Sequence, residues 1–487
     1  MQHILNFHRL FPLHWLSLLV VSLMTSLNPT LEINYHSNTP QDDTSMLIDG
    51  GIVVTMDSVG TILDGGAVLI EDERIVDLLD AEMPRPEADT VIDATGHVVI
   101  PGLINTHGHA AMSLFRGLAD DLPLQTWLNE YIFPAEAALV SPDFVYWGTL
   151  LSSIEMLKSG TTTFTDMYFF RDDVVRATTT AGIRVAAGPV AIGFPTPDFS
   201  TAEESLASAH EFMEQYQNHP LVIPSVSAHA IYTTPLDIIE TAFRVAEKHR
   251  AVFQIHVLED STENTISRGA NGMDVIDALM SIDALRPGTI LAHSVFLSDD
   301  DIRHIAMTGA GIAHNPQSNL HLGVPGVAPI PAALKAGIPV GLGTDGPAAN
   351  NNLDLFEEMN TAAKLQKLQH GDPSILSAET TFRMATMGGA QVLNMEKEIG
   401  SLEPGKHADI VLIDMQRAGL TPLYNVYSHL VYAVRGSDVS TVFVNGKKVV
   451  DQRKMTTVNE DEVISKSNSF SDQVQQVIAG LRQSDGS

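Results

Sequence analysis

The sequence of 487 residues contains no cysteine. This absence excludes disulfide bonds, thiolate catalysis, iron–sulfur clusters and zinc sites with cysteine ligands, including the site of cytidine-type deaminases. A transition metal would have to be bound by histidine and carboxylate side chains. The chain has 19 His and 59 Asp plus Glu from which such a site could be built.

Basic residues are also scarce. Lys and Arg number 28 against 59 Asp and Glu, which gives a formal net charge of −31. Because a phosphate backbone attracts positive surfaces, this charge argues against a nucleic-acid partner. Hydrophobic residues make up 44% and charged residues 18%, with 35 Gly and 25 Pro, which is typical of a globular protein. The length predicts one large domain or two to three ordinary ones.

Long apolar runs are nearly absent. The one candidate, Leu10–Leu27, is interrupted by Pro12 and His14. It fits the apolar part of a secretory signal better than a membrane span, which needs about 20 unbroken apolar residues. No clear cleavage site follows it, and a first strand begins at Met46. Residues 1–45 are therefore either a signal peptide, which implies export, or an upstream extension of a cytoplasmic protein. No stable membrane span is predicted in the mature chain.

From residue 98 onward, short β-branched apolar runs alternate with amphipathic helical segments such as Pro235–Arg250. Strands that alternate with helices predict a parallel sheet, and eight such units over about 250 residues predict a closed (β/α)8 TIM barrel. An open doubly wound sheet is the alternative. It would normally carry a glycine-rich phosphate loop after its first strand, where this chain has Asn105-Thr106-His107-Gly108-His109. The eight predicted strands are Val98–Ile104, Thr161–Thr165, Arg184–Val190, Leu221–Ser227, Val252–Ile255, Thr289–Ala292, Gly311–Ala313 and Ile338–Gly343.

Strand-rich segments flank the predicted barrel, which covers residues 98–395. Residues 46–97 and 396–455 are expected to pair into a small β-sandwich domain formed from both chain ends. Residues 456–487 are expected to form a helical tail without a chemical role. The strands predicted in the two flanks are Gly51–Met56, Gly66–Glu71, Arg74–Leu79, Asp409–Ile413 and Val439–Val450.

Polar residues follow nearly every predicted barrel strand, at the rim where barrel enzymes place their chemistry. A single histidine there is more often a hydrogen-bonded structural residue, but five histidines and acidic residues on one rim favour a metal site. Side chains two apart on an extended segment point the same way and can share one ion. Three imidazoles and a carboxylate suit Zn²⁺ or another divalent ion, with a position left for water. The strand-end residues are His107, His109, Asp166, His229, His256, His293, Asn315 and Asp345, and the predicted ligands are His107, His109, His256 and Asp345.

Glu259 follows His256 by three residues, where its carboxyl group could reach a substrate rather than the metal. The alternative for Glu259 is an exposed acid on a loop. The end of strand four carries His229 and no lysine, so a carbamylated lysine cannot bridge two metals there. The predicted cofactor is one divalent ion, with Zn²⁺ favoured over iron, manganese and nickel.

Several motifs resemble the amidohydrolase superfamily. More narrowly, the chain is similar to the 5-methylthioadenosine/S-adenosylhomocysteine deaminase group, to which triazine chlorohydrolases are related. The similarity extends over about residues 46–450, with the segment from Arg116 to Leu124 and Trp127 pointing to the deaminase group. The matching segments are Pro101–His109, Leu114–Leu124, Ser159–Thr163, Leu342–Gly346 and Gly405–Asp409.

The resemblance implies a metal-dependent hydrolytic deaminase of adenosine-type purines, which releases ammonia and leaves the inosine analogue. It implies the same four metal ligands. It also implies roles in proton transfer for Asp345, which takes the proton of the water, and Glu259, which protonates the purine ring nitrogen. The remaining implied roles are orientation of the attacking hydroxide by His293, substrate contact by His229, a pocket wall at Trp127 and binding of ribose hydroxyls by Glu136.

Three departures from the group affect substrate specificity. Ala349 stands where serine is usual, Gly188-Pro189 replaces a segment that often carries a substrate-binding arginine, and the run from His321 replaces one led by lysine. A chlorohydrolase, or an aminohydrolase acting on triazines, guanine or pterins, therefore stays an alternative. A non-catalytic binding protein is a remote one, because it would be expected to have lost a ligand or Glu259. The expected partner is a small purine nucleoside, and a homo-oligomer is left open.

Overall fold

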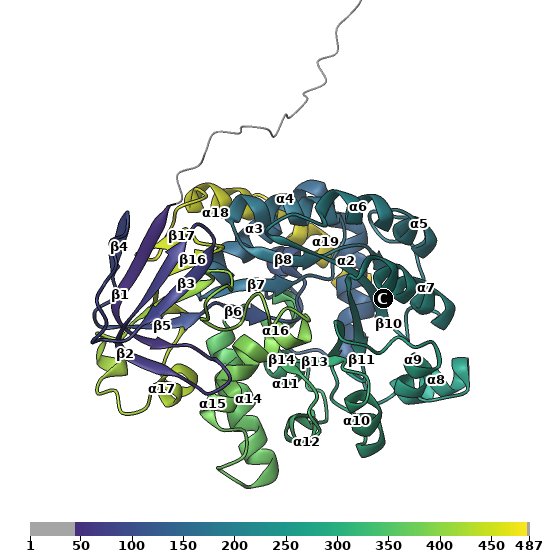
Figure 1. The fold of residues 1–487 in the computed structure, drawn as a ribbon. Helices are drawn as coiled ribbons and strands as arrows, with labels where there is room; N and C mark the ends of the chain where they lie inside the picture. The colour runs from purple at the N-terminus through teal and green to yellow at the C-terminus, as the bar shows by residue number, and fades with distance from the viewer. Residues whose placement is uncertain (1–43, 485–487) are drawn as a thin grey trace, which may run out of the picture. The chain divides into compact units, whose positions relative to one another are not determined.

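The computed structural model describes residues 44–484 of the chain (Figure 1). The signal peptide or extension predicted for residues 1–45 lies outside the described residues, apart from the last two positions. Within residues 44–484, no helix has both the length and the apolar character that crossing a bilayer requires.

Eight parallel strands form a closed barrel, and this confirms the predicted TIM-barrel fold. Closure is complete because β14 pairs with β6 and β10 pairs with β11. The short strands β8 and β9 together form the third of the eight barrel strands, because both pair with β10. The barrel strands are β6 (Leu103–Asn105), β7 (Thr161–Thr165), β8 (Arg184–Ala187), β9 (Val190–Ala191), β10 (Val222–Ala230), β11 (Val252–Val257), β12 (Thr289–His293), β13 (Gly311–His314) and β14 (Val340–Leu342).

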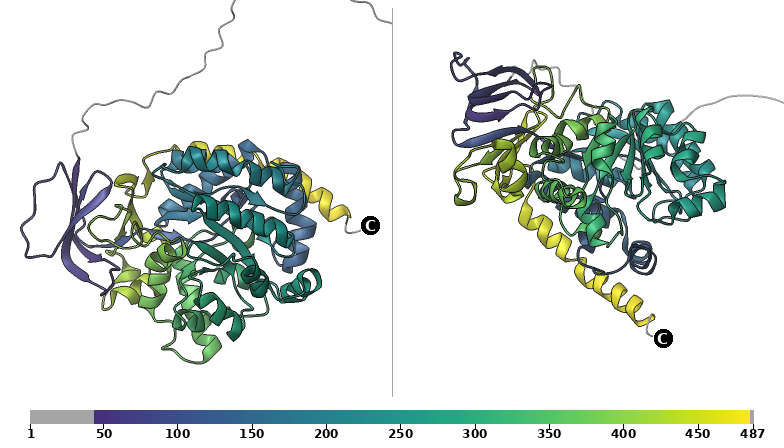
Figure 2. Two further views of the ribbon diagram at one scale, coloured as in Figure 1. Left: turned by 45° about the vertical axis from the view of Figure 1, so that its right-hand side comes forward. Right: turned by 90° about the horizontal axis from the view of Figure 1, so that it is seen from below.

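Helices surround this barrel (Figures 1 and 2). In α7 (Leu236–His249), the apolar residues Ile239, Ala242, Phe243 and Ala246 recur at helical spacing and are all buried. The other helices of the outer layer are α3 (Pro142–Lys158), α4 (Arg171–Ala181), α5 (Ala202–Ala207), α6 (Ala209–Tyr216), α8 (Glu263–Asn271), α9 (Val275–Ser281), α10 (Asp299–Ala306), α12 (Ile330–Lys335), α14 (Leu355–His370), α15 (Ala378–Arg383) and α16 (Gly389–Val392).

The first predicted strand, Val98–Ile104, is wrong as a single element. It divides into β5 (His97–Pro101), which belongs to a second sheet, and β6, which belongs to the barrel. The division falls at Gly102, where a Cβ atom would lie 2.0 Å from the Thr162 hydroxyl oxygen. Only glycine allows this close approach. The predicted third strand is divided in the same way at Gly188, where a Cβ atom would lie 1.6 Å from the carbonyl oxygen of Ser225.

The second sheet has nine strands and combines both ends of the described chain, as predicted (Figure 1). Its order is β18-β17-β16-β15-β5-β1-β2-β3, with β4 also paired to β1. One face buries Val53, Ile70, Val99, Ile410 and Phe443 in a common core. Besides β5, its strands are β1 (Ser45–Val54), β2 (Ile62–Glu71), β3 (Arg74–Leu79), β4 (Thr90–Asp93), β15 (Ile410–Asp414), β16 (Val439–Val444), β17 (Lys447–Asp451) and β18 (Lys454–Met455).

The predicted strand Val439–Val450 is a hairpin of β16 and β17 instead of one strand. The turn consists of Asn445 and Gly446, whose φ angles are 51° and 74°. Two consecutive residues in the left-handed region form a two-residue turn whose twist matches that of the flanking strands, and Asn-Gly is the favoured sequence for this turn. The turn signal was present in the sequence, but the apolar run on both sides hid it.

A buried ion pair joins the second sheet to the barrel. Arg184 of β8 donates to the Asp409 carboxylate, and the two side chains are 1% and 4% exposed. The other oxygen of Asp409 accepts from the backbone N–H of Asn445 at 2.7 Å. The chain then ends, as far as it is described, in α18 (Glu460–Asn468) and α19 (Ser471–Ser484).

Candidate metal centre and active site

The four predicted metal ligands lie together at the carboxyl ends of the barrel strands. His107 and His109 follow β6, His256 lies in β11, and Asp345 follows β14. The carboxylate oxygen Oδ1 of Asp345 lies 3.5 Å from His107 Nε2 and 3.2 Å from His109 Nε2. His109 Nε2 lies 3.4 Å from His256 Nε2. Residues almost 240 positions apart thus present their polar atoms to one point.

These separations fit a single tetrahedral ion. Ligand atoms that are each about 2.0–2.1 Å from a tetrahedral zinc ion lie about 3.3–3.4 Å from one another. The three measured separations around His109 and Asp345 are 3.2, 3.4 and 3.5 Å. The donor set is therefore chemically suited to Zn²⁺, and these three of its six separations match those of a tetrahedral site.

The hydrogen bonds of the histidines also fix which ring nitrogens face the centre. His109 Nδ1 lies 2.7 Å from the carbonyl oxygen of Met167, and His256 Nδ1 lies 2.7 Å from that of His229. A carbonyl oxygen only accepts, so each Nδ1 carries a proton and each neutral ring has a lone pair on Nε2. Two lone pairs would then face each other across 3.4 Å. A positive charge between them removes this repulsion.

Other polar groups at the centre would also be stabilised by a cation. Both ring nitrogens of His107 are buried without a hydrogen-bond partner. Burial alone would lower the pKa of His109, but the adjacent Asp345 carboxylate raises it to about 9. Burial would raise the pKa of Asp345, but the adjacent imidazoles of His107 and His109 hold it well below its usual range. A proton satisfies this arrangement in part, and a divalent ion would satisfy it fully.

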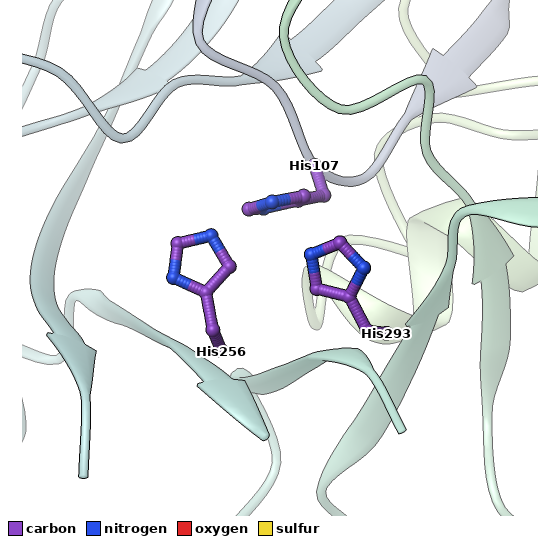
Figure 3. Close-up of side chains that lie close together, drawn as sticks. All are labelled: His107, His256 and His293. Carbon is purple, nitrogen blue, oxygen red and sulfur yellow. The ribbon is translucent and has the colours of Figure 1, made fainter. Parts of the chain in front are cut away.

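His293 lies in the same group. Ring nitrogens of His107, His256 and His293 all lie within 4.8 Å of one another, and Figure 3 shows the three rings converging. His293 Nδ1 lies 2.9 Å from the side-chain oxygen of Asn319, and Nε2 lies 4.0 Å from Asp345 Oδ2. The backbone of His293 has a φ of 69°, which is uncommon for a residue with a side chain and aims the ring at the centre.

Glu259 lies beside His293 and is buried, so it is not the exposed loop acid of the alternative interpretation. Its Oε1 lies 3.6 Å from His293 Nδ1, and its side chain is 5% exposed. Burial and the nearby Asp345 charge raise the pKa of Glu259 well above its usual range. Its loop is held by the buried carboxylate of Glu263, which accepts backbone N–H groups of Leu258, Glu259 and Asp260 at 2.9, 2.7 and 3.0 Å.

The predicted substrate contacts line one cavity above this centre. Trp127 begins the π-helical turn η2 (Trp127–Ile132), and Glu136 lies in α2 (Phe133–Leu139). Burial raises the pKa of Glu136 to about 7, against a lowering effect of Tyr168. His229 Nδ1 lies 2.8 Å from the hydroxyl of Thr233, and burial lowers the pKa of His229 to about 3, so its ring is neutral. All three predicted substrate contacts face the cavity together with Glu259, His293 and Asp345.

The three departures noted in the sequence lie around this cavity. Ala349 is buried in the short helix α13 (Pro347–Asn350). Pro189 separates β8 from β9, and its neighbour Val190 lines the cavity. His321 ends α11 (Pro316–His321) with Nε2 3.3 Å from Asp120 Oδ1, and residues 322–325 line an adjoining hollow that shares Leu124 and Glu259 with the cavity.

Helix α11 supplies two residues that sequence reasoning missed. The Ser318 hydroxyl donates to Asp345 Oδ2 at 2.6 Å, and Asn319 is the partner of His293. Glu263 was missed as well. The signal that could have revealed α11 is Pro316, because proline directly after a strand-end Asn315 favours the first turn of a helix. Asp166, noted only as a strand-end acid, accepts the backbone N–H of Ala110 at 2.7 Å and so fixes the turn after His109.

Known proteins resemble the chain over most of its length. Residues 98–449 match the amidohydrolase family. The 5-methylthioadenosine/S-adenosylhomocysteine deaminase 1 of Syntrophus aciditrophicus is 43% identical over 437 residues, which are 89% of this chain and 98% of that protein. The 5'-deoxyadenosine deaminase of Methanococcoides burtonii is 42% identical over 86% of this chain and 95% of its own length.

Solved structures give the same result for the fold. A zinc-bound adenosine deaminase from Xanthomonas campestris superposes with a TM-score of 0.86 at 34% identity, covering 89% of this chain and 99% of that one. A zinc complex of atrazine chlorohydrolase from Arthrobacter aurescens has a TM-score of 0.82 at 24% identity, covering 87% and 99%. The second likeness concerns the fold alone.

Proposed function

Since the chain belongs to the amidohydrolase family, we propose that it is a metal-dependent hydrolytic deaminase of adenosine-type purine nucleosides. The reaction converts the ring C–NH₂ group to C=O and releases ammonia. One observation carries the proposal: a metal-ligating cluster and the buried acid Glu259 face the same cavity. Deaminases of 5-methylthioadenosine, S-adenosylhomocysteine and 5'-deoxyadenosine are the relatives that match almost end to end.

We propose that one Zn²⁺ is held by Nε2 of His107, His109 and His256 and by a carboxylate oxygen of Asp345. The support is the opposed Nε2 lone pairs, the unpartnered nitrogens of His107 and the ligand separations near 3.3 Å. When bound, a divalent ion there lowers the pKa of water to about 7.

The residues of the chain supply the proton transfers. Asp345 Oδ2 is hydrogen-bonded by Ser318 and accepts the proton that the nucleophilic water loses. His293 Nε2 faces the same side and orients that water, because Nδ1 is engaged with Asn319. Glu259, whose pKa is raised by burial and by the nearby Asp345 charge, donates its proton to the ring nitrogen beside the reacting carbon. The leaving amino group departs as ammonia after it takes up the proton held by Asp345, and the new hydroxyl group loses its proton to Glu259 as the C=O bond forms.

The cavity wall positions the nucleoside. Trp127 packs against the base or the sugar, and the Glu136 carboxyl group lies deep enough to accept the ribose hydroxyls. His229 is neutral and held by Thr233, so it presents one ring nitrogen as a fixed hydrogen-bonding group. Each of these assignments predicts an effect on KM when the side chain is shortened.

The test is a direct assay of the purified protein with 5'-methylthioadenosine, measuring ammonia and zinc content. We expect about one zinc per chain, loss of turnover after chelation and its recovery with Zn²⁺. Asp345→Ala and Glu259→Gln should nearly abolish turnover while the protein stays folded. Ser440→Ala, a buried change in the second sheet, is the control and should retain activity. Full activity after exhaustive chelation, or chloride release from triazines without deamination of any purine, would overturn the proposal.

A further inference from the structure

Apolar side chains line much of the cavity, and one of them, Phe133, is a neighbour of Glu136. Phe133 and Glu136 lie three residues apart in α2, which makes them neighbours on one helix face, and both line the cavity. Val190 and Ile192 line it from the segment after β8 and are 8% and 3% exposed. Phe194 stacks edge to face on Phe133 at 5.2 Å and is 38% exposed. We name Phe133, Val190, Ile192 and Phe194 the apolar wall.

The proposed orientation of the nucleoside brings its 5' substituent to this wall. The reacting carbon of the base must lie at the metal ligands and Glu259, while the ribose hydroxyls lie at Glu136. The group attached to the 5' carbon then extends from the ribose, beside the neighbours of Glu136. One such neighbour on the same helix is Phe133, whose ring also lies 6.0 Å from the His229 ring.

The lining offers no lysine or arginine to a 5' substituent. Among the described residues that line the cavity, the acidic side chains are Glu136, Glu259 and Asp345, and none is Lys or Arg. The adjoining hollow adds Asp260 and likewise no Lys or Arg in the described chain. Arg171 follows the lining residue Phe169 by two positions, but its guanidinium carbon lies over the rings of Phe199 and Phe212, at 5.6 and 5.2 Å.

We infer that the apolar wall determines specificity and selects adenosines whose 5' substituent is uncharged, such as methylthio or hydrogen, over those that carry a carboxylate. The inference rests on the proposed function and sharpens it, because the relatives include deaminases named for both kinds of substrate. A carboxylate at this wall loses its hydration without gaining a lysine or arginine as a partner. An alkylthio group gains from the same burial.

Four substrates separate charge from length: 5'-methylthioadenosine, 5'-deoxyadenosine, 5'-butylthioadenosine and S-adenosylhomocysteine. The last two have side chains of similar length, and only S-adenosylhomocysteine carries a carboxylate and an ammonium group. We expect kcat/KM for S-adenosylhomocysteine to be lower than for the butylthio compound by about tenfold or more. Equal values for these two compounds would overturn the inference while leaving the proposed deaminase intact.

A matched pair of variants tests the wall itself. Ile192→Lys should raise the ratio of kcat/KM for S-adenosylhomocysteine over butylthioadenosine by about tenfold. Ile192→Met, of similar length without charge, should leave that ratio unchanged. An equal shift in both variants would contradict the inference. If the lysine variant does not fold, the comparison of substrates with the unmodified protein still decides. Failure to deaminate all four compounds would instead refute the proposed function.

Discussion

Removal of the Ser318 hydroxyl should weaken the metal centre and catalysis without lowering the free energy of unfolding to the same extent. The Ser318 hydroxyl donates to Asp345 Oδ2 at 2.6 Å, and both residues are buried, with exposures of 0% and 6%. A hydrogen bond to a charged group contributes about 1.5–3 kcal/mol. Ser318→Ala therefore should lower kcat/KM or zinc affinity by about 10- to 150-fold.

The assays are kcat/KM for methylthioadenosine across pH, zinc affinity by competition with a chelator, and the free energy of unfolding. A donor to the carboxylate favours its ionised form, so its loss should move the acidic limb of the pH–rate profile to higher pH. Ser440→Ala is the matched control, because its hydroxyl donates to the carbonyl oxygen of Leu412 at 3.1 Å, away from the centre. Changes below about threefold in both kcat/KM and zinc affinity, in a folded variant, would refute the reasoning.

Three further predictions concern buried or half-buried carboxylates. Asp409→Ala leaves the buried Arg184 charge without its partner and should lower the free energy of unfolding by about 3–5 kcal/mol in urea titrations. The double variant Arg184→Met with Asp409→Leu should restore most of this loss. Equal losses in the single and double variants would contradict the prediction. Glu263→Gln should lower kcat about tenfold with unchanged zinc content, because backbone N–H groups of the loop that carries Glu259 lose a carboxylate acceptor. An unchanged kcat would show that this loop keeps its conformation without the Glu263 carboxylate. Burial raises the pKa of Asp354 to about 6, so this residue stabilises the fold most at pH below 3.8 and progressively less as pH rises to about 6. Asp354→Asn should flatten that slope in urea titrations, and identical slopes would exclude Asp354 as its source.

The barrel and the convergence of the proposed ligand residues could be predicted because both depend on short-range patterns. Each strand is a short apolar run, and a parallel barrel brings all strand ends to one rim. Once that rule is applied, His107, His256 and Asp345 must approach one another wherever the intervening helices lie. The strand boundaries were less accurate. The sequence pattern could not show that the run before Asn105 serves two sheets, because the break depends on how closely Gly102 approaches Thr162.

The supporting residues could not be predicted from strand ends. Ser318 and Asn319 follow β13 by several residues and reach Asp345 and His293 only because α11 turns back over the rim. Glu263 depends equally on the path of the loop after β11. The apolar wall combines α2 with the segment after β8, which are about 55 residues apart, so neither segment reveals it alone.

By itself, the sequence determined which chemical groups this protein can use: imidazoles and acids for a metal, no thiol, few cations, and a repeating strand and helix pattern that places the acids and imidazoles at strand ends. Only the tertiary structure decided which ring nitrogens face the centre, which carboxyl groups lose their water and so change their pKa, and which side chains touch across the cavity. The physical reason is that chain pattern is a property of neighbours in sequence, whereas hydrogen-bond partners and burial are set by residues that meet only when the barrel closes.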